Sequence, residues 1–77
     1  ANLNGNWTDG STRNAIISVQ FPALAIDMSA WNRPAARGWF QSPFTILVNF
    51  PDGGTFTGDI ASTRINWSNG SGWVKRP

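Results

Sequence analysis

The sequence predicts an all-β domain in which seven or eight short strands form an antiparallel meander that closes into a small barrel. Apolar and polar residues alternate along most of the chain, no segment has a helical period, and turn residues interrupt the alternation about every ten residues. Without helices to make crossovers, successive strands run antiparallel. Closure hides the sheet edges, and a two-layer sandwich is the alternative. We expect residues 1–77 to form one domain.

Alternating segments define three strands in the first part of the chain: residues 3–7, 15–21 and 24–28. The first strand has Leu3 and Trp7 on one face. In the second and third strands apolar residues occupy every second position, and Pro22 separates the two strands.

Five further strands are expected at residues 35–40, 44–50, 55–60, 63–68 and 73–76. The segment 44–50 gives the clearest pattern, since Phe44, Ile46, Val48 and Phe50 share one face. Turns rich in Gly and Asn or Asp separate the later strands.

A hexapeptide repeat links the two ends of the chain. Asn6-Trp7-Thr8-Asp9-Gly10-Ser11 returns as Asn66-Trp67-Ser68-Asn69-Gly70-Ser71. Asp-Gly and Asn-Gly favour type I′ turns, in which both central residues have positive φ. We therefore predict that both segments form a strand with a Trp followed by a tight turn, and that barrel closure brings them near each other.

The composition excludes most catalytic and metal chemistry. The chain has no Cys, His, Glu or Tyr, so it has no disulfide, no thiolate metal site and no histidine base. Asp52 and Asp59 flank one expected strand and could form a carboxylate pair, and the Asp52 turn could bind calcium. We favour a turn role for Asp52 and a solvated strand position for Asp59. The sequence thus predicts no enzyme activity, no metal and no cofactor.

Charge and hydropathy limit the partners. The net charge is +2, and the basic residues are scattered, so we expect no nucleic-acid partner. No apolar run is long enough for a membrane helix, so we expect no membrane insertion. Low charge with much Asn, Ser, Thr, Gly and Trp is typical of secreted binding domains, and we expect a secreted or extracellular protein.

Three segments resemble those of small, uncharacterised all-β domains of secreted bacterial proteins: Met28-Ser29-Ala30-Trp31-Asn32-Arg33-Pro34, Phe50-Pro51-Asp52-Gly53 and Ile65-Asn66-Trp67-Ser68-Asn69-Gly70-Ser71. That resemblance implies an all-β fold and no particular activity. Gly5-Asn6-Trp7 is similar to the Gly-x-Trp opening of longer calycin barrels such as avidins and lipocalins, which implies a ligand cavity. The segment from Trp67 to Trp73 is similar to the Trp-Asp-Gly-x-Gly-Trp turns of fucose-binding propeller lectins, which implies sugar binding.

The Trp residues divide into core and site candidates. Trp7 and Trp67 share faces with apolar neighbours and are predicted to lie in the core. The predicted ligand-binding residues are Trp31, Asn32, Arg33, Arg37, Trp39 and Trp73. Arg37 and Trp39 share a strand face that should point outward, and with Trp31 and Arg33 they should gather at one end of a hairpin. Alternatively, Trp31 folds back over the end of the barrel, and Trp73 has no clear preference.

The predicted function is non-catalytic, lectin-like carbohydrate binding. Sugar rings stack their C–H faces on exposed indoles while Arg and Asn side chains bind the hydroxyls. The same exposed aromatics could instead join copies of the chain into a homo-oligomer or bind a protein, as in a secreted inhibitor.

Overall fold

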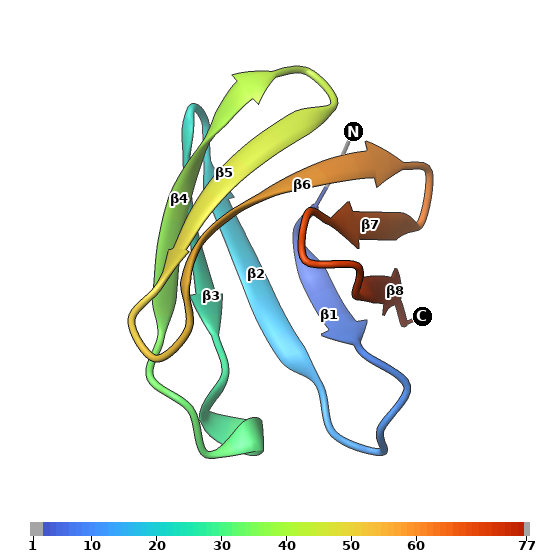
Figure 1. Ribbon diagram of the computed structural model, residues 1–77. Helices are drawn as coiled ribbons and strands as arrows, with labels where there is room; N and C mark the ends of the chain where they lie inside the picture. Colours follow the sequence, from blue (N-terminus) through green and yellow to red (C-terminus); the bar gives the residue numbers. More distant parts are fainter. Residues whose placement is uncertain (1–2, 77) are drawn as a thin grey trace.

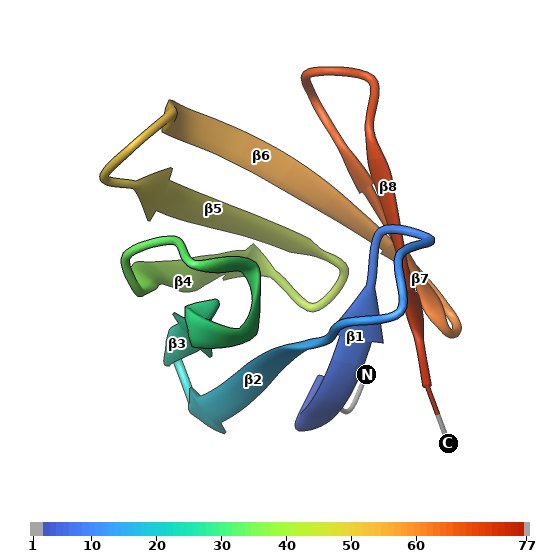
Figure 2. The same ribbon diagram turned by 90° about the horizontal axis from the view of Figure 1, so that it is seen from below.

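The computed structural model describes residues 3–76 and is a closed antiparallel β-barrel (Figures 1 and 2). Its strands are β1 (Gly5–Thr8), β2 (Ala15–Gln20), β3 (Ala23–Asp27), β4 (Ala36–Ser42), β5 (Thr45–Phe50), β6 (Gly54–Ala61), β7 (Arg64–Trp67) and β8 (Gly72–Lys75). Each strand pairs with the next, and β8 pairs with β1 to close the barrel. The predicted meander and its closure are confirmed, and the sandwich alternative is wrong.

Because successive strands run in opposite directions, the loops after β1, β3, β5 and β7 lie at one end of the barrel, which we call the loop end. The tight turns after β2, β4 and β6 lie at the other end, the turn end. A short 3-10 helix, η1 (Ser29–Trp31), lies between β3 and β4 at the loop end (Figure 2). The Asp27 carboxylate accepts a hydrogen bond from the backbone N–H of Ser29 at 2.9 Å where this helix begins.

Period-two alternation fills the interior with apolar side chains, as in other small barrels. The buried apolar residues form one cluster: Leu3, Trp7, Ala15, Ile17, Leu24, Ile26, Met28, Ala36, Ile46, Val48, Phe50, Ile60, Ile65, Trp67 and Trp73. Trp7 is 0% exposed, and its Nε1 donates a hydrogen bond to the carbonyl of Leu3 at 2.8 Å. The predicted core positions of Trp7 and Trp67 are confirmed.

Gly58 on β6 makes room for the Trp67 ring. The two residues are directly opposite each other across β6 and β7. A Cβ added at Gly58 would lie 2.9 Å from the Trp67 ring and 2.8 Å from a methyl group of Ile65, closer than side-chain carbons normally approach. A larger residue at this position would therefore displace the indole.

The two hexapeptides form similar turns, but these are not the type I′ turns that the sequence predicts. Gly10 and Gly70 have positive φ, whereas Asp9 and Asn69 do not. In each copy the side-chain Oδ1 of the Asp or Asn instead accepts a hydrogen bond from the backbone N–H two residues later, at 3.1 Å and 3.0 Å. This side-chain bond supplies the turn without a second left-handed residue. Both turns lie at the loop end, and β8 separates β1 from β7.

Phe44 does not share the buried face of β5, which begins at Thr45. Its side chain lies in the turn between β4 and β5 and is 63% exposed. The register of β4 against β5 shifts between Phe40 and Ser42, just before this turn, and the apolar alternation of the sequence continues one residue beyond the strand. Phe21, expected at the end of the second strand, likewise lies in a turn and is 74% exposed.

Candidate functional sites

The predicted site residues are divided between two regions: Trp31, Asn32, Arg33 and Trp73 at the loop end, and Arg37 and Trp39 on the outer face of β4. The prediction that they gather at one end of a hairpin is wrong. Trp39 pairs with Ala23 at the start of β3, whereas η1 follows the end of β3. The length of the hairpin therefore separates Trp39 from Trp31.

On the outer face of β4, Arg37 and Trp39 point into solvent as the alternation predicts. The indole of Trp39 is 51% exposed. Across the β3–β4 ladder, Trp39 is opposite Ala23 and Arg37 is opposite Ala25. Because directly opposed side chains are immediate neighbours on a sheet face, each of these large side chains has a methyl group on its β3 side. That side of the indole is therefore left open.

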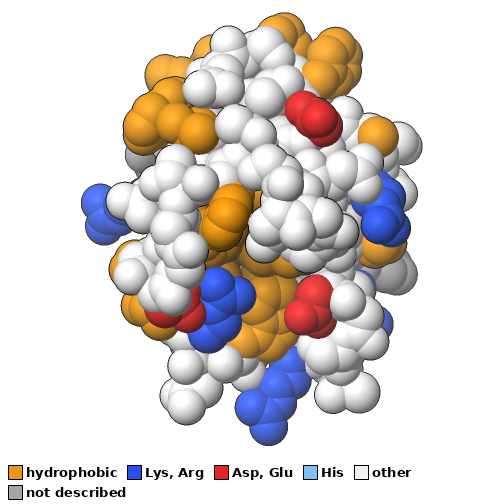
Figure 3. All heavy atoms as spheres, in the orientation of Figure 1, with side chains coloured by type: hydrophobic (Ala, Val, Ile, Leu, Met, Phe, Trp, Pro, Cys, Tyr) orange, Lys and Arg blue, Asp and Glu red, His pale blue; other side chains and the backbone are white. Residues whose placement is uncertain are grey.

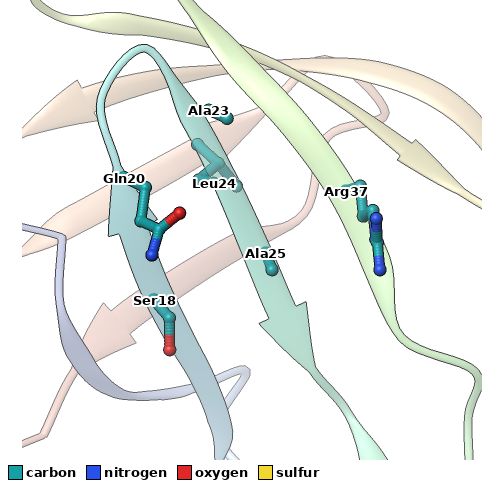
Figure 4. A pocket seen from close by; sticks show the side chains of 6 residues that line it. All are labelled: Ser18, Gln20, Ala23, Leu24, Ala25 and Arg37. Atoms are coloured by element: carbon teal, nitrogen blue, oxygen red, sulfur yellow. The ribbon is translucent and has the colours of Figure 1, made fainter.

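The small residues on β3 create a groove between β2 and β4, which we call the alanine groove (Figure 4). It is a hollow of about 380 Å³ lined by Ser18, Gln20, Ala23, Leu24, Ala25 and Arg37. Figure 4 shows Ser18 and Gln20 along β2 on one side and Arg37 on β4 on the other. The two strands are two sheet spacings apart, or about 10 Å, which is wide enough for one extended chain of sugars or amino acids.

Ser18 and Gln20 are candidate binding residues that the sequence analysis does not identify. The alternation of β2 places them on the outer face, and the register places them opposite Ala25 and Ala23. The sequence does contain a signal for the groove: Ala23 and Ala25 occupy alternate positions, so the outer face of that strand carries only small side chains. It becomes informative only when the strands on both sides of β3 are known.

At the loop end, Trp31 and Trp73 belong to a packed aromatic cluster. The Trp73 ring lies 5.3 Å from Trp31, 5.0 Å from Trp67 and 6.1 Å from Phe50, all in edge-to-face arrangements. The Nε1 of Trp31 donates to the carbonyl of Arg13 at 3.0 Å. Trp31 is thus half-buried over the end of the barrel, as the alternative prediction for this residue states. Trp73 is only 5% exposed. Neither ring is an open stacking platform.

Arg33 and Asp52 join the loops after β3 and β5 through a bidentate ion pair. The Nε and Nη2 atoms of Arg33 donate to the two carboxylate oxygens of Asp52 at 2.8 Å and 3.1 Å. The guanidinium also lies 5.6 Å from the centre of the Phe50 ring. Hydrogen bonding to Arg33 lowers the pKa of Asp52 below its ordinary value and raises that of Arg33. Both side chains are about one-third exposed, so the pair holds the loops in place more than it stabilises the fold.

A small hollow of about 60 Å³ lies beside this ion pair, and we call it the loop-end hollow. It is lined by Arg33, Phe50, Phe56, Trp67, Asn69, Ser71 and Trp73. In Figure 3, hydrophobic side chains are visible in a depression below the centre of this face, with basic and acidic side chains around it. The Nε1 atom of Trp67 is buried and has no hydrogen-bond partner among the described residues.

The structure places Asp52 and Asp59 apart, so they do not form the carboxylate pair that the sequence allows. Asp59 lies five residues after the start of β6, roughly 17 Å from the turn that contains Asp52. It approaches Thr45, whose hydroxyl is 3.5 Å from the Asp59 carboxylate. Within residues 3–76, no group of three or more acidic residues could hold a metal ion.

Comparisons of this chain with protein-family models, with curated proteins and with solved structures found no match. In the part of the chain that the structure describes, no helix is sufficiently long and apolar to cross a membrane. The two hollows described above and their side chains are therefore the features that indicate a function.

Proposed function

We propose that this protein is a non-catalytic carbohydrate-binding module whose binding site is the alanine groove together with Trp39. The observation that carries the proposal is the half-exposed indole of Trp39, which lies directly beside a groove that the side chains of Ser18, Gln20 and Arg37 line. An indole so exposed costs free energy in water unless a ligand covers it.

The groove supplies both parts of sugar recognition. The flat C–H face of a pyranose ring stacks on an indole, as other apolar groups do on aromatic faces. Its hydroxyls need donors and acceptors. The amide of Gln20 and the hydroxyl of Ser18 each provide both, and the guanidinium of Arg37 provides donors. The methyl groups of Ala23 and Ala25 at the base of the groove let the ring approach the sheet.

The charge of the groove favours a neutral ligand over nucleic acid. Arg37 is the one charged side chain among the residues that line it. A nucleic-acid site combines stacking residues with several cations and loses affinity steeply as salt rises. We therefore expect glycan binding here to change little between low and physiological salt.

The proposal is tested by calorimetry with a ligand selected from a glycan array. Trp39→Ala should lower affinity at least about fivefold, because stacking on one aromatic is worth on the order of 1–3 kcal/mol. Phe44→Ala is the matched control, since it removes an exposed aromatic at the turn end and should leave affinity unchanged. Equal losses in both variants, or no loss in Trp39→Ala, would contradict the assignment of the site.

A second candidate function is self-association or protein binding through the turn end. Phe21 and Phe44 are the two most exposed large apolar residues in the described chain. The Phe21 ring packs against Phe40 at 5.2 Å, which fixes its position at the surface. A solution mass above 8.4 kDa that returns to 8.4 kDa in the double variant Phe21→Ser, Phe44→Ser would support an oligomer. A monomeric mass for the native protein would contradict it.

A further inference from the structure

We propose that the loop-end hollow is a second binding site, distinct from the alanine groove, that accepts a neutral acetamido group. Such a group combines a methyl group, a carbonyl oxygen and an N–H, and it occurs on N-acetylated sugars and on acetylated lysine side chains. The inference depends on the size, the lining and the charge of the hollow, and none of these features involves Trp39.

The size of the hollow selects a small group. Its volume of about 60 Å³ is twice the share of liquid volume that one water molecule occupies, about 30 Å³. That space holds about two water-sized groups, such as the methyl group and the carbonyl oxygen of an acetamido group, and is too small for a sugar ring. The rest of any ligand would therefore lie outside, against the polar residues at the rim.

Four of the seven residues that line the hollow are aromatic. Phe50, Trp67 and Trp73 contact one another edge to face, and Phe56 lies 6.1 Å from Phe50. A methyl group among these rings loses contact with water and gains dispersion contacts. A hydroxyl or an ammonium group in the same place would lose hydration that the rings do not replace.

Two of the residues that line the hollow, Trp67 and Asn69, carry N–H donors. The buried Nε1 of Trp67 has no hydrogen-bond partner within residues 3–76, which is unusual because an unsatisfied buried N–H costs about 1–3 kcal/mol. The Oδ1 of Asn69 already accepts from the backbone N–H and the hydroxyl of Ser71, at 3.0 Å and 2.7 Å, which leaves its NH₂ group to donate. A carbonyl oxygen is the group that these donors lack.

The electrostatics favour a neutral ligand over a carboxylate. Asp52 engages Arg33 through both of its oxygens, so the positive charge at the rim is already neutralised. The carboxylate of Asp9 also acts on Arg33, adding to the rise in its pKa. Arg33 is therefore already paired, and a neutral group can enter the hollow without breaking this ion pair.

The test is an NMR titration of the indole N–H signals of the native protein. The five Trp residues give separate Nε1–H resonances, so each ring reports on its own surroundings. The probes are N-acetylglucosamine, N-acetyl-lysine amide and glucose, each added in the millimolar range. We expect either acetylated probe to shift the Trp67 resonance while glucose does not, and the more effective probe identifies the source of the group. An equal shift with glucose, or none with both acetylated probes, would overturn the proposal.

Two matched variants test the donor role of Asn69. Asn69→Asp keeps the turn, because Asp9 forms the same Oδ1 bond in the other hexapeptide, and removes the NH₂ donor. It should weaken binding of the acetylated probe about tenfold, and the reverse change Asp9→Asn should leave it unaltered. Equal effects of the two changes would contradict the proposal. Trp39→Ala should not alter the Trp67 response, which separates this site from the alanine groove.

Discussion

Replacing the same side chain at two positions tests whether the Trp residues are correctly divided between core and surface. Trp7 is fully buried and donates to the Leu3 carbonyl, whereas Trp39 is half exposed on the outer face. Trp→Phe at each position keeps an aromatic ring and removes one ring and one N–H. The chemistry of the change is therefore constant, and only the environment differs.

The expected costs differ several-fold. At position 7 the smaller ring buries about 50 Å² less, worth about 1.2 kcal/mol, and the orphaned Leu3 carbonyl adds about 1–3 kcal/mol. Trp7→Phe should therefore lower the free energy of unfolding by about 2–4 kcal/mol, a large part of the 4–12 kcal/mol typical of about 77 residues. At position 39 half of the area is already exposed, so Trp39→Phe should cost below about 1 kcal/mol.

The assay is urea unfolding followed by far-ultraviolet circular dichroism, because Trp fluorescence itself changes when a Trp is removed. The slope of free energy against urea should stay constant, and the midpoint alone should move. Similar midpoints for Trp7→Phe and Trp39→Phe would refute the division of the Trp residues into core and surface.

Two further predictions concern the ion pair and the packing around Trp67. Because Arg33 lowers the pKa of Asp52, the stabilisation from this pair is complete above the unfolded-state value near 3.9 and is lost as pH falls through the folded-state pKa. Urea midpoints should therefore fall below about pH 4, and fall less in Asp52→Asn; identical acid dependence in both proteins would count against the pair. Gly58→Ala should cost about 1–3 kcal/mol and alter Trp67 fluorescence, since the added Cβ meets that ring at 2.9 Å. Unchanged stability and emission would show that the ring has space to move.

The fold can be predicted from the sequence because one periodicity extends along the chain. Alternation determines which face of each strand is buried, and the absence of a helical segment leaves only antiparallel neighbours. The two hexapeptides, each with a buried Trp before a turn, lie near the two ends of the chain. Their similarity agrees with closure of the barrel, in which the last strand, β8, pairs with β1. The turn type cannot be predicted from Asp-Gly alone, because the side chain of Asp9 offers the backbone a competing hydrogen bond.

The site is harder to predict, because it depends on which strands are neighbours. The exposure of Trp39 follows from Arg37 on the same strand face. The groove beside it requires the register of β3 against both β2 and β4, which local patterns do not contain. Trp31 has no alternating neighbours, and its position over the barrel end depends on a hydrogen bond to Arg13 from a distant loop.

The proposed carbohydrate function is tested most directly by a glycan-array screen of the native protein and of Trp39→Ala, with the solution mass of each measured on the same samples. We predict saturable binding of the native protein to one class of glycan, and loss of that binding in a variant that stays folded. Absence of binding by the folded native protein, or equal binding by the two proteins, would contradict the proposal.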